Sequence, residues 1–197
     1  MNLWTFSPPF PATYLADPGR SILLGAEPHG KPGDVTRDMG QWFRDPPKDG
    51  TRFLRPIMLA ASLLDGVTID PRTASPAQVL SSWRYLDMVP QEAGPVVEGD
   101  FMGRVRKWSP WLLDNLLSDA PARVVLLGSH VHRAFESIVV PLLRSSPLSS
   151  LLRLGLPHPA ARRPYLSAGE VGDPASRLRP LSEPLLVLGR GGWRAHI

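Results

Sequence analysis

The chain has 197 residues, a formal net charge of +4 and an isoelectric point of about 10.0, which suits a polyanionic partner. It contains no cysteine, which excludes disulfides, thiolate nucleophiles and cysteine-ligated zinc or iron–sulfur clusters. The sequence shows neither an apolar run of bilayer length nor a secretory signal, so we expect a cytoplasmic protein without membrane association.

Apolar spacing and the positions of glycine and proline divide the first half of the chain into elements. A short apolar run ended by a glycine predicts a buried strand, and apolar residues three and four apart predict a helix. The expected elements are an irregular lead-in at residues 1–19, a strand at 21–25, a loop to about residue 50, a helix at 53–64, a short helix at 76–82 and a strand at 83–89.

The second half follows the same alternation of helices and strands. Its strongest strand signal is the run Val-Val-Leu-Leu at residues 124–127, which ends at a glycine. The expected elements are a helix at 111–117, this strand, a helix at 130–143, strands at 151–156 and 185–188, and a basic tail at 189–197. The length favours a single domain over residues 1–197.

Strands separated by helices predict right-handed crossovers and a mostly parallel sheet. The expected fold is therefore α/β, a three-layer sandwich with a short, mostly parallel central sheet flanked by helices. Ligands bind such sheets beyond the carboxyl ends of the strands. Four segments follow predicted strands and are expected to converge there: residues 25–33, 87–91, 128–132 and 157–165.

These segments carry recognisable short motifs. They include Gly-Ala-Glu-Pro-His-Gly at residues 25–30, Tyr-Leu-Asp-Met-Val-Pro at 85–90, Leu-Leu-Gly-Ser-His-Val at 126–131 and Leu-Pro-His-Pro-Ala-Ala at 156–161. In this order and spacing, over roughly residues 20–165, they resemble the motifs of the uracil-DNA glycosylase superfamily. The resemblance implies a monomeric enzyme without cofactor or metal, which flips a base out of double-stranded DNA and hydrolyses its glycosidic bond.

The resemblance also implies a role for each matched residue. Glu27 stands where one branch of the family has its water-directing Asp, with Asp34 and Asp38 as alternative carboxylates. His158 stands where the family's His steadies charge on the leaving base. The implied substrate-binding residues are Ala26, His29, Trp42, Phe43 and Asp87, and the implied DNA-binding residues are Pro46, Pro47, Lys48, Gly128, Ser129, Arg162 and Arg163.

Three positions depart from the family pattern. Glu27 replaces an Asp, Asp87 replaces the base-reading Asn, and the wedge Leu after the His motif is missing, with Arg162 nearest to its place. An Asn side chain offers a donor and an acceptor, which suits uracil, whereas a carboxylate only accepts and suits the exocyclic amine of cytosine. A protonated Asp87 is the other option, since it could pair with the ring nitrogen.

Asp87 therefore predicts a cytosine-type base. Excision of plain cytosine would destroy the host genome, so we expect a further requirement, such as a substituent on carbon 5. His29 stands where the uracil-specific branch blocks that carbon with a Tyr, and it is flanked by glycines that leave room. Because bulky cytosine modifications occur in some phage genomes, the resulting hypothesis is an anti-phage glycosylase acting on a cytosine modified at carbon 5, such as hydroxymethylcytosine or its glucosylated form.

Each candidate residue also has a structural interpretation. Glu27 could be a solvated loop carboxylate, and His158, beside two prolines, could be a turn residue. Asp87 could cap a helix or pair with an arginine. Trp42 and Phe43 could simply belong to the core.

Other functions and sites remain open at this stage. His130 and His132 have a spacing that could bind metal, but no carboxylate lies close to them in the sequence, which favours ordinary residues at a helix start. The alternative functions are a uracil-DNA glycosylase of base-excision repair and a non-catalytic reader of modified DNA. A hydrolase of free nucleotides ranks last, because no phosphate-binding glycine loop with Lys-Ser or Lys-Thr is present.

Overall fold

A central sheet organises the computed structural model, which describes residues 3–28, 38–47, 50–91, 100–160 and 167–196. Within these ranges seven strands form one sheet in the order β2-β1-β3-β4-β6-β7, and the short strand β5 pairs with β4. The parallel strands are β1 (Ser21–Gly25), β2 (Trp83–Asp87), β3 (Arg123–Leu127), β4 (Leu152–Leu156) and β6 (Leu186–Gly189). The two antiparallel strands are β5 (Arg179–Pro180) and β7 (Gly192–Ala195).

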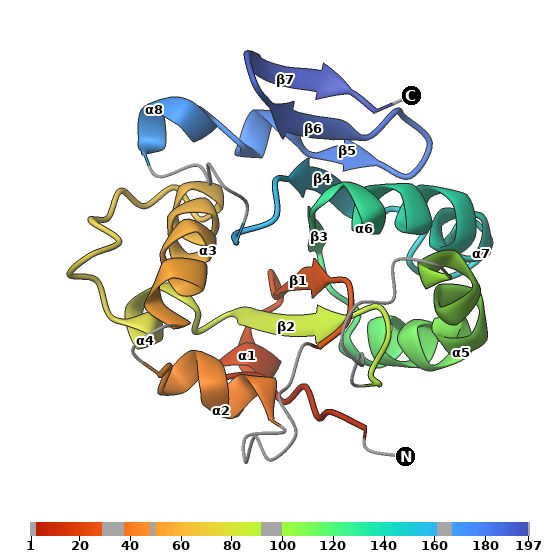
Figure 1. Cartoon of the computed structure of the whole chain (residues 1–197), viewed down its shortest axis with the longest axis horizontal. Coiled ribbons are helices and arrows are strands. Elements are labelled where there is room, and N and C mark those ends of the chain that lie inside the picture. The colour runs from red at the N-terminus through yellow and green to blue at the C-terminus, as the bar shows by residue number, and fades with distance from the viewer. Residues whose placement is uncertain (1–2, 29–37, 48–49, 92–99, 161–166, 197) are drawn as a thin grey trace.

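Helices cover both faces of this sheet. They are α1 (Pro11–Ala16), α2 (Met39–Arg44), α3 (Thr51–Leu64), α4 (Pro76–Val79), α5 (Phe101–Asp119), α6 (Ser129–Ala134), a π-helical turn (Phe135–Val139), α7 (Val140–Leu143), α8 (Ala168–Val171) and a 3₁₀ turn (Ala175–Arg177). Figure 1 shows α3 and α4 on one side of the sheet and α5, α6 and α7 on the other. The predicted three-layer α/β fold is confirmed. None of the helices in the described ranges has both the length and the apolar character needed to cross a membrane.

The core forms because the central strands are apolar on both faces. Ile22, Leu24 and Val125 have no exposed surface, as expected for parallel strands covered by helices on each side. These three residues belong to the same hydrophobic core as Ile57 and Ala61 of α3, which lie four residues apart on one face of that helix.

The register of the sheet brings the carboxyl ends of four strands to the same level. Gly25 pairs with Asp87, Leu24 pairs with Leu126, and Leu127 pairs with Leu156. The segments that follow β1, β2, β3 and β4 therefore all begin at one edge of the sheet. This arrangement positions the candidate site.

The structure corrects the expected elements at both ends of the chain. The lead-in at 1–19 is not wholly irregular, because α1 forms behind Pro11, a residue suited to the first turn of a helix. The loop expected up to residue 50 contains α2, whose N-cap Asp38 accepts a hydrogen bond from the backbone N–H of Gly40. The basic tail expected at 189–197 contains β7, which pairs with β6 as a hairpin.

The helix expected at 111–117 is longer than predicted, because α5 continues through Pro110. A proline in a helix leaves the carbonyl four residues earlier without its backbone donor. Here that carbonyl belongs to Arg106, and the hydroxyl of Ser109 donates to it over 2.9 Å. The neighbouring serine thus satisfies the carbonyl and allows the helix to start ten residues before the predicted position.

One buried arginine joins the C-terminal segment to the sheet. Arg153 of β4 is fully buried, and its Nε and Nη2 donate to the carboxylate of Glu136 over 2.7 and 2.8 Å. The same guanidinium donates to the carbonyls of Arg179, Pro180 and Glu183. A buried charge is tolerated only when it is paired and its donors are satisfied, and this set of partners meets that condition.

Candidate functional site

A buried carboxyl group stands at the carboxyl end of β2. Asp87 is 1% exposed, and its Oδ1 accepts a hydrogen bond from the hydroxyl of Tyr85 over 2.8 Å. Tyr85 and Asp87 are two residues apart on the strand and therefore share one face. The paired residue on β1 is Gly25, where a Cβ atom would overlap the Tyr85 hydroxyl and Asp87 Oδ1. Glycine at this position thus gives the two polar groups the space they occupy.

Burial controls the protonation of this pair. The pKa of Asp87 is raised to about 7, mainly by burial. The hydrogen bond from Tyr85 opposes this shift, and the charge of Glu27 adds to it. Burial, together with the nearby Asp87 carboxylate, also holds the pKa of Tyr85 well above its usual value. Tyr85 therefore remains a donor at neutral pH, while Asp87 exists there as both acid and carboxylate. Within the described ranges no arginine forms an ion pair with Asp87.

Glu27 is held by an ion pair rather than solvated. Arg104 of α5 donates to it through two nitrogens, Nε to Oε2 and Nη2 to Oε1, each over 3.0 Å. The side chains are 10% exposed for Glu27 and 22% exposed for Arg104. The forked pairing fixes the plane of the carboxylate. Arg104 was not identified from the sequence, because nothing in its local pattern indicates this partner.

Four aromatic side chains, Trp42, Phe43, Phe53 and Tyr85, form a group that we call the aromatic cluster. The Phe43 and Tyr85 ring centroids are 4.9 Å apart with the rings tilted by 31°, and Phe53 lies 6.2 Å from Tyr85. Phe53 also contacts the imidazole of His158 edge-on, at a centroid distance of 5.8 Å. The cluster thereby connects β2 to the segment after β4. In the sequence, Phe53 is only the first residue of the predicted helix at 53–64.

Within this cluster the two aromatic residues predicted to bind substrate, Trp42 and Phe43, differ in exposure. Phe43 is 1% exposed and belongs to the core, as its structural interpretation held. Trp42 is half-buried, packs edge-on against Phe43 at 5.3 Å and keeps accessible surface. Trp42 is therefore the more accessible of the two rings for stacking with a base.

His158 follows β4 and is exposed at the same edge of the sheet. Its Nδ1 accepts a hydrogen bond from the backbone N–H of Ala160 over 3.2 Å, which is a turn-type contact. Because Nδ1 acts as the acceptor, the neutral imidazole carries its proton on Nε2 and can donate from there. Gly128, with φ of +99°, lies against this residue: a Cβ there would come 3.2 Å from the His158 Cβ. Gly128 and Ser129 thus lie next to His158.

The remaining predicted residues have varied surroundings. Ala26 is half-buried and its carbonyl accepts from the N–H of Val89 over 3.1 Å, which joins the segments after β1 and β2. Asp38 accepts from the hydroxyl of Ser7 and caps α2, so it has a structural role. Pro46 is half-buried, Pro47 is exposed, and both follow α2. His29, Asp34, Lys48, Arg162 and Arg163 lie outside the described residues.

Of the two histidines near the start of α6, His132 has buried structural contacts. The Nε2 atom of His132 lies 3.1 Å from the carbonyl oxygens of both Leu126 and Leu156, and burial lowers the pKa of this histidine to about 4. A neutral imidazole that donates to carbonyls is not available as a metal ligand through that nitrogen. In the described ranges no group of three or more His, Asp or Glu side chains could hold a metal ion.

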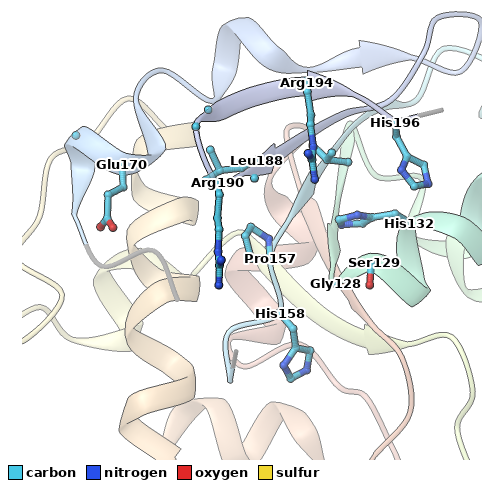
Figure 2. Close-up of a pocket in the computed structure, with 15 residues that line it drawn as sticks. Gly128, Ser129, His132, Pro157, His158, Glu170, Leu188, Arg190, Arg194 and His196 are labelled. Carbon is cyan, nitrogen blue, oxygen red and sulfur yellow. The ribbon is translucent and has the colours of Figure 1, made fainter. Parts of the chain in front are cut away.

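A pocket of about 960 Å³ lies beside His158, between the Gly128–Ser129 segment and the β6–β7 hairpin (Figure 2). Its wall includes His158, Gly128 and Ser129 but neither Asp87 nor Glu27. Other lining residues come from α8 and the hairpin, among them Glu170, Arg190 and Arg194. His158 is therefore shared between this pocket and the group around Asp87.

Comparisons with known proteins do not assign the chain to a family. No family model matches the sequence, and no curated protein matches it. The basis for a functional conclusion is therefore the chemistry of Asp87, Glu27, His158 and their neighbours.

Proposed function

We propose that this protein is a DNA glycosylase that binds a flipped cytosine-type base, substituted on carbon 5, and hydrolyses its N-glycosidic bond. The observation that carries the proposal is one constellation at one sheet edge. The buried carboxyl of Asp87 and the exposed imidazole of His158 are bridged by the rings of Tyr85 and Phe53. A flipped base needs a group that reads its polar edge and a donor for its oxygen, and these two side chains offer both.

Asp87 is suited to reading a base in its neutral form. A neutral carboxyl group has one donor and one acceptor, which match the ring nitrogen N3 and the exocyclic amine N4 of cytosine. Tyr85 donates to Oδ1, so the carboxyl proton is favoured on Oδ2. The two oxygens therefore have different roles, and this bond favours one arrangement of the donor and the acceptor.

His158 and Glu27 would act on the bond itself. As the bond between N1 of the base and C1′ of the sugar breaks, its electrons pass to the base, and negative charge builds on O2. A proton on Nε2 of His158 would stabilise that charge. The sugar becomes cationic, and the Glu27 carboxylate would stabilise it and orient the water that adds to C1′, with the water's proton leaving to the base or solvent. Arg104 fixes the orientation of Glu27.

A requirement for a substituent on carbon 5 would protect the host genome. An enzyme that released plain cytosine would damage every genome it met. We therefore propose hydroxymethylcytosine or its glucosylated form as the substrate and defence against phage as the biological role.

Two other functions are each favoured by a particular observation. A neutral Asp87 can also pair with uracil if the donor and acceptor exchange places, and its pKa of about 7 makes that form available. This favours a uracil-DNA glycosylase of base-excision repair. The second is a non-catalytic reader, because Arg104 already binds both carboxylate oxygens of Glu27.

The test is a base-release assay on matched duplexes that carry uracil, cytosine, hydroxymethylcytosine or glucosylated hydroxymethylcytosine at one position. Alkali cleaves the strand wherever an abasic site forms. Preferential cleavage at a substituted cytosine supports the proposal, and preferential cleavage at uracil supports the repair enzyme. Tight binding to substituted cytosine without cleavage supports the reader, and cleavage at plain cytosine contradicts the requirement for a substituent.

A further inference from the structure

Two arginines on the β6–β7 hairpin project toward the pocket beside His158. Figure 2 shows Arg190 extending from the hairpin turn toward Pro157 and His158, with Arg194 extending in a similar direction. Both side chains are exposed. Neither guanidinium has a hydrogen bond or an ion pair with any residue in the described part of the chain. This contrasts with Arg104 and Arg153, which are paired with Glu27 and Glu136.

The hairpin holds these two cations on an ordered scaffold. Arg190 and Gly191 form a two-residue turn between the paired Gly189 and Gly192, and φ of +90° at Gly191 favours glycine there. Arg194 is paired with Val187 in the ladder, and its guanidinium lies along Gly189, where a Cβ would come 3.2 Å from Nε.

A second contact fixes the hairpin against the pocket wall. The indole nitrogen of Trp193 donates to the carbonyl of Val171 at the end of α8 over 3.0 Å. The acidic residue on that wall, Glu170, accepts from the backbone N–H and the hydroxyl of Ser167 over 2.9 Å. The pocket therefore presents two arginines opposite a carboxylate that is engaged in capping its own helix.

We propose that this pocket binds backbone phosphates of the DNA strand that carries the flipped base, with Arg190 and Arg194 as the phosphate ligands. The inference rests on the proposed glycosylase function. Guanidinium groups bind phosphate oxygens in a bidentate way, and phosphate contacts fix the register of a protein on DNA. Gly128 and Ser129, two residues for which the sequence resemblance implies a role in DNA binding, line the same pocket.

Ring chemistry favours the DNA backbone over a substituent on carbon 5 as the occupant. If Asp87 reads N3 and N4 and His158 donates to O2, the base has a defined direction in the site. C2, which bears O2, and C5 are opposite atoms of a pyrimidine ring, whereas N1, which bears the sugar, is next to C2. With O2 at His158, the sugar attached to N1 lies close to His158 and carbon 5 lies on the opposite side of the ring. The pocket on the side of His158 away from Asp87 is therefore next to the sugar and its phosphates, not next to carbon 5.

The first experiment measures the salt dependence of binding to an unmodified duplex, which needs no base release. Each phosphate contact contributes about one unit to the slope of log K against log salt. We expect the double substitution Arg190→Ala with Arg194→Ala to lower the slope by about two units and the affinity on the order of 10-fold at moderate salt. Replacement of both by lysine should restore most of the slope.

The matched control is Arg72→Ala, because Arg72 is also an exposed arginine but lies in the loop between α3 and α4, before the amino end of β2. It should leave the slope unchanged. An unaltered slope in the double variant of a protein that binds DNA would overturn the phosphate site and leave the glycosylase proposal standing. A wild-type protein that binds no DNA would overturn both.

A second experiment uses the absence of cysteine from the chain. Arg190→Cys introduces a single thiol, which should form a disulfide with a duplex carrying a thiol tether on a phosphate adjacent to the target nucleotide. Arg72→Cys should not cross-link. Cross-linking of Arg190→Cys only to a tether on carbon 5 of the base would show that the pocket binds the substituent and that the phosphate assignment is wrong. A double alanine variant that alters only the preference among substituted bases would lead to the same conclusion.

Discussion

The hydroxyl of Tyr85 donates to Oδ1 of Asp87 over 2.8 Å, on the face of β2 that overlies Gly25. The bond stabilises the charged form of Asp87, whereas burial opposes it more strongly. The protonation of Asp87 is thus balanced between two opposing effects near neutral pH, and Tyr85 contributes one of them.

This balance predicts a pH profile. If the neutral form of Asp87 reads the base, the single-turnover rate of base release should fall as pH rises through about 7. In Tyr85→Phe the fall should move to higher pH, because the hydrogen bond that lowers the pKa of Asp87 is lost. Rates measured between pH 5 and 9 for both proteins check this. A rate that increases through pH 7, or the same midpoint in both proteins, would contradict it.

The same pKa shift predicts a pH-dependent stability. Asp87 titrates near its ordinary 3.8 in the unfolded chain and near 7 in the folded protein. The folded state thus binds this proton more tightly than the unfolded chain does. The resulting contribution to the free energy of unfolding is fully present below about pH 4 and is lost as pH rises through 7. The loss is on the order of 4 kcal/mol. Asp87→Asn should remove this decline, and urea unfolding at pH 5 and pH 8 checks it; equal declines in both proteins would contradict it.

His158→Ala should slow base release by roughly 10²-fold while leaving DNA affinity nearly unchanged, because a donor to developing charge acts mainly in the transition state. His130→Ala is the matched control, since His130 is another exposed histidine near the same sheet edge and lies outside the proposed chemistry. Its rate should equal that of the wild type. Weaker binding with an unchanged single-turnover rate in His158→Ala would indicate a structural role instead.

Gly25→Ala should destabilise the fold by about 2 kcal/mol or more, because the added Cβ overlaps the Tyr85 hydroxyl and the Asp87 carboxylate. Gly169→Ala is a suitable control, because a Cβ there meets nothing within 4 Å and the residue is helical. The control should be neutral or slightly stabilising. Equal free energies of unfolding for Gly25→Ala and the wild type would show that the backbone relaxes around the new methyl group.

The sequence predicted the central architecture because the strongest signals coincide there. The apolar runs at residues 21–25 and 124–127 became β1 and β3, and Ser75 caps α4 with a reciprocal bond to Gln78. Prediction failed at Pro110, which resembles the residue just before a helix start, because the sequence alone does not show that the hydroxyl of Ser109 satisfies the carbonyl of Arg106. It also failed at the C-terminus, where arginine and glycine obscure the alternation of the short strand β7.

The sequence predicts which residues at strand ends come together, but it does not predict which residues of the neighbouring helices contact them. Asp87 ends a strand, and Glu27 and His158 follow strands, so topology alone puts all three at one edge. Arg104 and Phe53 reach that edge from helices, and no local pattern reveals which carboxylate or imidazole a helical side chain will meet. Contacts between a strand end and a helix of the neighbouring layer can be identified only from the tertiary structure.

The burial of Arg153 has a consequence for how the chain is made. Its guanidinium binds carbonyls as far along as Glu183, thirty residues after Arg153 itself. A nascent chain that has emerged only as far as β4 would have Glu136 as the one side-chain partner of this charge and would lack the three later carbonyls. The edge of the sheet beside β4 can therefore close only after residues 179–183 have left the ribosome.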